Sequence, residues 1–493
     1  MGQLRFRLHD RGRIPAGGLE RIYVAGAEEI PWPTRCRWQG EELVVERTNS
    51  ESGSIYAPWV VDGQGECFLS SATLMERERP YVLEVELARG LIQRIRNRLF
   101  IWEWLGMLTP KPLVEQLQDA TRSFSRAATH QDDLARASGF ANEAIAGALR
   151  TSEDLVAAYS QQATMSRMQQ TPVSTLLGVA LSPKTPSVEI RRKLVEACNI
   201  IQIPIAWRAI EQSEGKRNWK HTDQQLAWCQ QAGLKVSAGP LLQLDDRGIP
   251  DWMVLWDGDF DNLVHLLLDH VRAVVSRYAG RVHLWLVASR VNTGKLLSLE
   301  EEQRLNLVAH AVELVRRLDP RTPVVVSFDQ PWAEYLSGQT DDLAPTHFAD
   351  ALVRADLGIS GFALEVNAGF RPGGSTIRPT FEWGRLLDQW SLWGLPLMVN
   401  LSAASDTSRD PSAAKNIEVA PPTGYSTAGH DRQRHYAGSV LPFLLARSAV
   451  QVVMWNQLSD GEPHEFPHAG LFDATQQPKP TLALIRDLRK SLL

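Results

Sequence analysis

The sequence predicts an α/β protein in which a (β/α)8 barrel fills the C-terminal two thirds of the chain, after a small β-sandwich-like domain and a helical linker. Three observations predict this arrangement. Strand-like runs separated by turn residues fill 1–108, a helix-favouring composition fills 109–172, and apolar runs alternate with amphipathic segments over 173–493. A chain of 493 residues is long enough for these three parts.

The first part shows a repeated pattern of short apolar runs bounded by Gly, Pro, Asn or Asp. These runs cover residues 21–24, 42–46, 55–61 and 81–87. In the last run, apolar residues alternate with Glu84 and Glu86, which favours a half-exposed strand. We expect a β-rich domain that either binds carbohydrate through its aromatic residues or packs on its neighbour as a purely structural unit.

The second part is rich in Ala, Gln, Ser, Arg and Glu, which favour long helices. Leu113, Leu117, Ala120 and Phe124 recur at intervals of three and four residues, which indicates one apolar helix face. Farther on, Thr151-Ser-Glu-Asp resembles a helix start with acidic groups in the first turn. The sequence therefore predicts a helical hairpin that links two domains.

Eight short apolar runs define the third part. They cover residues 175–181, 200–207, 234–239, 282–288, 323–328, 359–364, 395–401 and 450–455. Amphipathic segments such as 262–278 and 298–318 lie between them. Eight strand–helix units favour a closed barrel, with an open doubly wound sheet as the alternative. In such a barrel the active site lies at the C-terminal ends of the strands, so polar residues at those ends are the candidate site residues.

Composition excludes several classes of partner. The net charge of -5 gives no reason to expect nucleic acid. The four cysteines show no CxxC spacing, so we expect no disulfide framework, no metal site and no cofactor. No run of about 18 apolar residues and no secretory signal is visible, which predicts a cytoplasmic protein without a membrane partner. The oligomeric state stays open. The sixteen tryptophans serve either as core residues or as stacking platforms for sugar rings.

Several motifs of the third part resemble glycoside hydrolase family 10, the xylanase-type TIM-barrel glycosidases. The segments that carry this resemblance are Trp207-Arg-Ala-Ile-Glu, Pro250-Asp-Trp252, Val282-His-Leu-Trp285, Trp455-Asn-Gln-Leu-Ser-Asp460, Gly470-Leu-Phe-Asp473 and Gln477-Pro-Lys-Pro480. The resemblance implies a carbohydrate ligand. It also implies retaining hydrolysis by two carboxyl groups about 5 Å apart, one acting as acid and one as nucleophile.

The two carboxylates that the resemblance implies are missing from their expected strands. The family's acid motif, Trp-Asp-Val-Val-Asn-Glu, falls on residues 285–290, so Arg290 stands at the position of the acid. An arginine side chain keeps its proton at any workable pH and is no proton donor. The nucleophile position, after residues 395–399, holds Leu401 or a neutral neighbour. The family mechanism therefore does not carry over as it stands.

Glu365 is the candidate replacement. The segment Gly361-Phe-Ala-Leu-Glu-Val-Asn367 is similar to the family's Gly-x-Gly-Leu-Gln-x-His, with Glu365 in place of the glutamine. One interpretation makes Glu365 a relocated catalytic carboxylate, assisted by Asp329 at the end of the preceding strand. The other pairs Glu365 with Arg290 in a salt bridge that neutralises both side chains.

The remaining candidates are expected to bind substrate. They are Ser289, Arg290, Asn292, Trp207, Arg208, Asn367, Trp455 and Asp460. Two arginines at one site would suit an acidic sugar, since the guanidinium fork matches a carboxylate or sulfate. The sequence thus predicts a divergent glycoside hydrolase-like protein that acts on or binds an oligo- or polysaccharide. The alternative is a non-catalytic pseudoenzyme barrel that binds glycan or serves as a scaffold.

Overall fold

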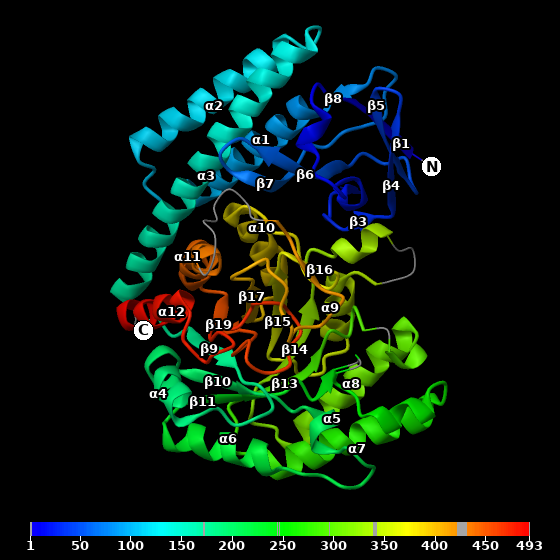
Figure 1. Cartoon of the computed structure of the whole chain (residues 1–493), viewed down its shortest axis with the longest axis vertical. Coiled ribbons are helices and arrows are strands. Elements are labelled where there is room, and N and C mark those ends of the chain that lie inside the picture. Colours follow the sequence, from blue (N-terminus) through cyan, green and yellow to red (C-terminus); the bar gives the residue numbers. More distant parts are fainter. Residues whose placement is uncertain are drawn as a thin grey trace.

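The computed structural model describes residues 2–170, 173–243, 245, 247–294, 296–338, 343–421 and 431–492. In Figure 1 the N-terminal strands and the first three helices lie at the top, and the barrel lies below them. The expected boundary between linker and barrel falls on residues 171–172, outside the described residues. Within the described ranges, no helix is both long and apolar enough to cross a membrane.

Two four-stranded sheets build the N-terminal part. One has the order β4-β5-β1-β8 and the other β3-β2-β6-β7. Their strands are β1 (Gly2–Arg7), β2 (Tyr23–Ala25), β3 (Pro31–Trp32), β4 (Thr34–Gln39), β5 (Glu42–Arg47), β6 (Ser54–Val61), β7 (Gly65–Ser70) and β8 (Tyr81–Val82). Side chains alternate between buried and exposed along β1, where Leu4 and Phe6 enter the apolar core.

The strand expected over residues 81–87 is wrong beyond its first two residues. Only Tyr81 and Val82 pair with β1, and the chain continues as helix α1 (Leu83–Trp104). Leu83, Leu87 and Leu91 are spaced by four residues, so they share one buried helix face. The side chain of Glu84 is also buried and accepts hydrogen bonds from the backbone of His9 and from the Ser138 hydroxyl. The acidic residues therefore occupy the first helical turn and not the outer face of a strand.

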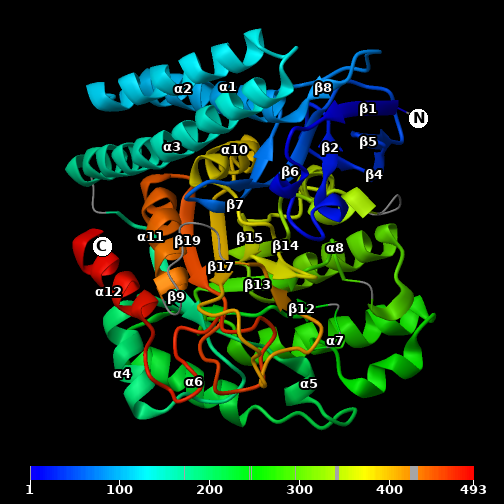
Figure 2. The same cartoon turned by 45° about the horizontal axis from the view of Figure 1, so that its top comes forward.

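Helices α2 (Lys111–Thr129) and α3 (Leu134–Gln170) pack against each other along the linker. Leu113, Leu117 and Ala120 lie on the buried face of α2. Helix α3 is the longest in the described chain, and it runs from the N-terminal sheets down to the barrel helix α11 (Asp431–Ala446), as both overall views show (Figures 1 and 2). The linker thus packs on both neighbouring parts.

A closed sheet of eight parallel strands confirms the barrel. The strands are β9 (Leu176–Ala180), β10 (Ile200–Ile203), β11 (Lys235–Ala238), β13 (Leu284–Ser289), β14 (Val324–Asp329), β15 (Gly361–Ala368), β17 (Leu397–Ala403) and β19 (Val450–Trp455). Each pairs with its neighbours, and the pairing of β11 with β13 closes the ring, with the short strand β12 (Leu242–Gln243) beside β13. This closure excludes the open doubly wound sheet.

The barrel interior is filled by side chains from successive strands, and it forms an apolar cluster separate from the main core. The cluster contains Ile200, Leu286, Val325, Ala363, Met398, Val452 and Met454. Every second residue of a strand faces the interior, so the next interior-facing residues lie nearer the C-terminal ends of the strands. The polar residues of the candidate site therefore lie above an apolar floor.

Eight helices surround the strands. They are α4 (Val188–Ala197), α6 (Lys220–Gln231), α7 (Phe260–Tyr278), α8 (Glu301–Leu318), α9 (Pro345–Arg354), α10 (Thr380–Trp390), α11 and α12 (Pro480–Leu492). A further short helix, α5 (Trp207–Ile210), follows β10. Their apolar faces pack on the outer side of the strands, as in other barrels of this kind.

An arginine of the barrel inserts among aromatic rings at the contact with the N-terminal part. Arg378 donates a hydrogen bond to the Tyr23 hydroxyl at 2.7 Å. Its Cζ lies 5.6 Å from the ring centroid of Tyr56, 4.8 Å from that of Phe68 and 5.1 Å from that of Trp332. Tyr23, Tyr56 and Phe68 belong to the β3-β2-β6-β7 sheet, so this sheet turns aromatic rings toward the barrel.

Candidate functional site

Strand register brings four polar side chains together at the C-terminal end of the barrel. Asp329 of β14 lies opposite Glu365 of β15, and Glu365 lies opposite Asn400 of β17. Ser289 ends the neighbouring strand β13. Because all these strands are parallel, residues at matching depth form one layer above the apolar floor.

Glu365 is surrounded by hydrogen-bond donors. The Nε of Arg290 lies 3.0 Å from Glu365 Oε1, and the Nη2 of Arg290 contacts the same oxygen. Asn367 Nδ2 donates to that oxygen at 2.9 Å, and Ser289 Oγ donates to Oε2 at 3.2 Å. Both carboxylate oxygens are therefore occupied, as expected for a charge buried inside a protein.

Arg290 also holds a second carboxylate, which comes from the segment after β19. Its Nη1 lies 2.8 and 2.7 Å from the two oxygens of Glu465. Arg247 pairs with Glu465 as well, and the ring centroid of Phe466 lies 5.6 Å from the Arg290 Cζ. The guanidinium thus joins the barrel strand β15 to the segment that covers it. The backbone of Arg290 has a φ of 57°, in the left-handed region that few side chains adopt.

The charges of this network stabilise one another. Burial alone would raise the pKa of Glu365, but the charge and hydrogen bonds of Arg290 outweigh it and hold that pKa below its ordinary value. Burial would likewise lower the pKa of Arg290, yet Glu365 and Glu465 hold it well above its ordinary value. Arg290 and Glu365 are therefore both ionised at neutral pH.

Asp329 has a different protonation behaviour. Burial, and next the negative charge of Glu365, raise the pKa of Asp329 to about 7. Its carboxylate accepts hydrogen bonds from the Gln330 backbone at 2.9 Å and from Thr293 Oγ1 at 3.3 Å. The side chain is 3% exposed and does not line the cavity above the strands. Asp329 is therefore a buried carboxyl that is partly protonated near neutral pH.

A cavity of about 230 Å³ opens above this network, and we call it the bowl. Ser289, Arg290, Glu365 and residues of the segment after β19 line it, together with the amides Gln202, Gln243, Asn400, Asn456 and Gln457. Two lining oxygens, Gln202 Oε1 and Asn400 Oδ1, are buried and have no hydrogen-bond partner in the described structure. These oxygens are acceptors that a ligand hydroxyl would satisfy.

Glu462 is a further carboxylate at the edge of the bowl, and its side chain is half-buried. Among the described residues it has no ion pair or side-chain hydrogen bond. The three carboxylates that line the bowl thus differ. Glu365 and Glu465 are held by Arg290, whereas Glu462 carries an unpaired charge.

The structure separates the residues expected at this site into two groups. Ser289, Arg290 and Glu365 line the bowl. Asn367 does not line it, but it donates to Glu365 and accepts hydrogen bonds from Ser402 Oγ at 2.6 Å and Asn456 Nδ2 at 3.1 Å. Asn292 is buried deeper and donates to the backbone oxygen of Asp329 at 2.9 Å. These side chains belong to one polar network.

The other expected residues lie away from the bowl. Trp207 is buried, stacks on His270 with 4.3 Å between ring centroids, and donates to Glu211 at 2.8 Å. Trp455 is also buried and donates to the Ala469 carbonyl at 2.8 Å. Arg208 pairs with Asp251 at 2.5 Å. The acidic-sugar hypothesis required two available arginines, and here both arginines already pair with carboxylates.

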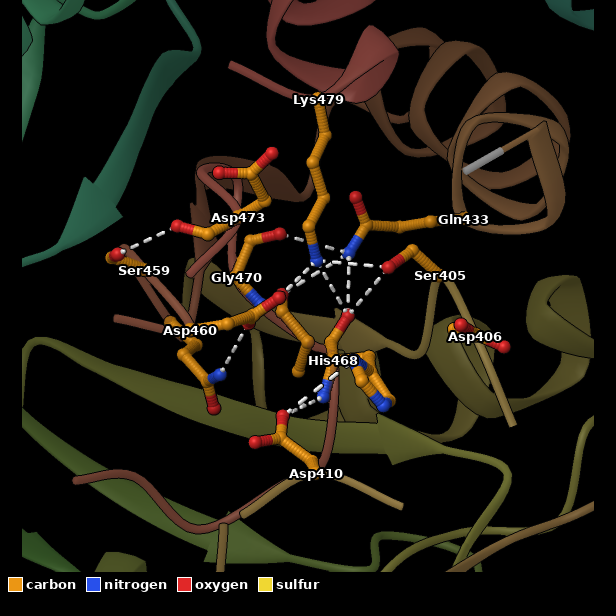
Figure 3. Close-up of polar contacts among 12 residues, drawn as sticks. Ser405, Asp406, Asp410, Gln433, Ser459, Asp460, His468, Gly470, Asp473 and Lys479 are labelled. Atoms are coloured by element: carbon orange, nitrogen blue, oxygen red, sulfur yellow. Dashed lines mark hydrogen bonds and ion pairs between the residues drawn. The ribbon is translucent and has the colours of Figure 1, made fainter. Parts of the chain in front are cut away.

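Asp460 is held by a buried ammonium group and does not line the bowl. Figure 3 shows Lys479 reaching down to it. Lys479 Nζ lies 2.5 Å from Asp460 Oδ2, 2.8 Å from Ser405 Oγ and 2.9 Å from the His468 carbonyl, so its three protons all have acceptors. This contact anchors the segment that presents Glu465 to Arg290.

Asp410, Asp460 and His464 form the one group of possible metal ligands found among the described residues, with ligand atoms within 4.8 Å of one another. Their oxygens already have donors. Asp410 accepts from the His468 backbone at 2.9 Å and contacts the His464 ring at 3.0 Å, while Asp460 accepts from Lys479. A lysine therefore supplies the positive charge at this position.

Sequence reasoning missed the amides and the covering carboxylates of the bowl. Gln202 and Asn400 had a detectable signal, since each is a polar residue inside an apolar strand run. Glu462 and Glu465 had none, because they lie in an irregular segment whose path depends on contacts such as Lys479 with Asp460.

Comparison with known proteins agrees with this fold. The family model described as glycosyl hydrolase family 10 matches residues 174–296. Endo-1,4-beta-xylanase C of Paenibacillus barcinonensis is 28% identical over 121 residues, which are 23% of this chain and 11% of that protein. The chain thus spans only a small part of that curated relative. The barrel is similar to glycosyl hydrolase family 10.

Solved structures similar to this chain include xylanase 10B from Thermotoga petrophila RKU-1 in complex with xylobiose. It has 15% identity and a TM-score of 0.49, and the match covers 65% of this chain and 96% of that chain. The GH10 structure from Paenibacillus barcinonensis has 18% identity and a TM-score of 0.47, with coverage of 65% and 96%.

Proposed function

We propose that this barrel, matched in its first part by the model of glycosyl hydrolase family 10, binds a neutral glycan in the bowl without hydrolysing it. One observation carries the proposal. Arg290 engages Glu365 and Glu465 at the same time, so two of the three carboxylates of the bowl are held by one guanidinium.

This contact opposes the chemistry of a retaining glycosidase. A nucleophilic carboxylate must offer a free oxygen to the anomeric carbon, and its partner must release a proton. Both oxygens of Glu365 accept hydrogen bonds, and Arg290 keeps its protons. A reaction at Glu365 would therefore have to break several buried charge-assisted hydrogen bonds first.

The lining of the bowl fits a neutral sugar. The positive charge of Arg290 is already compensated, and Glu462 would repel a uronate or sulfate. Amide side chains both donate and accept hydrogen bonds, as sugar hydroxyls do. The unpartnered oxygens of Gln202 and Asn400 would each gain a donor from such a hydroxyl.

Calorimetric titration with neutral xylo-oligosaccharides tests this proposal, because the relatives found by comparison are xylanases. We expect saturable binding to the wild type. Gln202→Ala or Asn400→Ala should weaken it about fivefold to thirtyfold, the loss of about 1–2 kcal/mol for one hydrogen bond. Arg208→Gln is the matched control outside the bowl and should leave binding unchanged.

Two results would refute a neutral-glycan site. One is the absence of binding to a panel of neutral oligosaccharides. The other is tighter binding of uronate-containing oligosaccharides than of neutral ones of equal length. Circular dichroism of each variant excludes loss of fold as the cause of an affinity change.

A second candidate function is hydrolysis by Glu365 and Asp329, and one observation favours it. The pKa of Asp329 is raised to about 7 while that of the neighbouring Glu365 is lowered. Two carboxyl groups with pKa values pushed apart are typical of an acid and its partner base. This function requires Arg290 to leave Glu365 when substrate binds. It predicts release of sugar from xylo-oligosaccharides that is lost in both Glu365→Gln and Asp329→Asn.

A further inference from the structure

A second cavity, of about 60 Å³, lies between the N-terminal part and the barrel. Strand β7, helix α3, the ends of β15 and β17 and helix α11 all contribute to its wall. Ala368, Ile377, Ala403 and Ala404 supply apolar surface. This interdomain cavity shares no lining residue with the bowl.

Arg432 brings a buried guanidinium to the interdomain cavity. It is 8% exposed, and its Nη2 donates to the Ala420 carbonyl at 2.8 Å. Its Nη1 is buried and has no hydrogen-bond partner in the described structure, and no ion pair joins Arg432 to a described carboxylate. An unpaired charged donor in a buried position is costly unless a ligand compensates it.

The other charged groups that line the cavity have partners of their own. Arg378 pairs with Glu334, and Glu66 pairs with both Arg21 and Arg371. The remaining charged lining residues are Glu153, which has a partner of its own, and Arg432.

Asp406 acts on Arg432 through its charge, but no ion pair joins the two among the described residues. Burial lowers the pKa of His435, so that ring adds no positive charge at neutral pH. A ligand carboxylate would supply the acceptor that the buried Nη1 of Arg432 lacks.

The size of the cavity limits the ligand. One buried water, which has one non-hydrogen atom, requires about 10–15 Å³ of cavity volume. The cavity of about 60 Å³ therefore holds roughly four to six non-hydrogen atoms. Acetate, propionate and butyrate have this size. Their carboxylate also matches the fork geometry of a guanidinium, and their methylene groups match the alanine and isoleucine wall.

We propose that the interdomain cavity is a binding site for a short-chain monocarboxylate, with its carboxylate on Arg432 and its alkyl part against Ala368, Ile377 and Ala403. A ligand there would contact the outer faces of β15 and β17. Asn367 and Ser402, on the opposite faces of the same strands, belong to the hydrogen-bond network of Glu365. The proposal does not depend on glycan binding.

Calorimetric titration of the full chain with acetate, propionate, butyrate, hexanoate and inorganic phosphate tests the site. We expect one saturable site whose affinity rises about fourfold for each methylene group from acetate to butyrate. Hexanoate should bind more weakly than butyrate, because it exceeds the cavity. Absence of saturable carboxylate binding, or tighter binding of phosphate than of butyrate, would overturn the proposal.

Variants locate the site. Arg432→Gln should weaken butyrate at least about tenfold, whereas Arg434→Gln, on the exposed face of the same helix, should bind as the wild type does. Unchanged butyrate affinity in a folded Arg432→Gln protein would place the ligand elsewhere.

If Arg432→Gln does not fold, crystals of the wild type with 3-bromopropionate provide the second measurement. The anomalous bromine peak is expected in the cavity beside Ile377, and a peak only at other positions would refute the site.

Discussion

Arg290 and Glu365 join the ends of two barrel strands, with Arg290 Nε 3.0 Å from Glu365 Oε1. Glu465 completes the same ion network from the covering segment. The contact determines what the bowl is able to do, because it turns a candidate catalytic carboxylate into one half of a buried ion pair.

Arg290→Met should lower the free energy of unfolding by about 3–5 kcal/mol, since it leaves Glu365 and Glu465 buried without their shared partner. The double variant Arg290→Met/Glu365→Gln should recover part of this loss. Urea denaturation measures both. Arg208→Met is the control, because an exposed pair contributes only about 0–1 kcal/mol. Equal losses in the Arg290 and Arg208 variants would show that the ion pair is not buried in solution.

Asp329 makes stability depend on pH in a defined direction. Its pKa is about 7 in the folded chain and about 3.9 when unfolded, so between these values the folded state binds more protons. The free energy of unfolding therefore falls as pH rises from about 4 to about 7, and then levels off. Asp329→Asn removes this titration. The difference in melting temperature, variant minus wild type, should be larger at pH 8 than at pH 5. An equal difference at both pH values would contradict the raised pKa of Asp329.

Arg378 connects the barrel to the N-terminal sheets. Arg378→Met removes its pair with Glu334 and its hydrogen bond to Tyr23, and should cost about 3 kcal/mol. Calorimetry should then show the N-terminal sheets unfolding at a lower temperature than the barrel. The matched control is Arg385→Met, whose arginine is nearly half exposed in its pair with Glu29. A single unshifted transition for Arg378→Met would disprove the proposed role.

Lys479 stabilises the segment that carries Glu465 (Figure 3). Lys479→Met leaves the buried Asp460 without its cation, so the variant should lose about 3–5 kcal/mol. Adding Asp460→Asn should restore part of that stability. Hydrogen exchange of the backbone amides of residues 460–472 should become faster in the single variant. Unchanged exchange there would mean that other contacts hold the segment.

The barrel could be predicted from sequence because each strand is a short apolar run followed by an amphipathic helix. The helix α1 was harder to predict. Its first turn alternates apolar residues with Glu84 and Glu86, and Glu84 is buried against His9 and Ser138, which lie far away in sequence. Local alternation alone therefore indicated a strand.

The site residues at strand ends could be predicted from the sequence, whereas those in the irregular segment after β19 could not. Arg290 and Glu365 follow directly from the strand pattern, and their pairing was one of the two interpretations of the sequence. Glu465 reaches Arg290 only through the folding of an irregular segment. Trp207 and Trp455, expected near the ligand, are buried. Their indole N–H groups donate hydrogen bonds to Glu211 and to the Ala469 carbonyl.

The most direct test of the central claim is to incubate the wild-type protein with neutral xylo-oligosaccharides in water enriched in oxygen-18 and to analyse the sugars by mass spectrometry. Hydrolysis would place the heavy oxygen at each new reducing end. With Glu365 held by Arg290, we expect saturable binding of these sugars and no labelled product. Labelled product from the wild type that disappears in Glu365→Gln would contradict it, because the carboxylate held by Arg290 would then be catalytic.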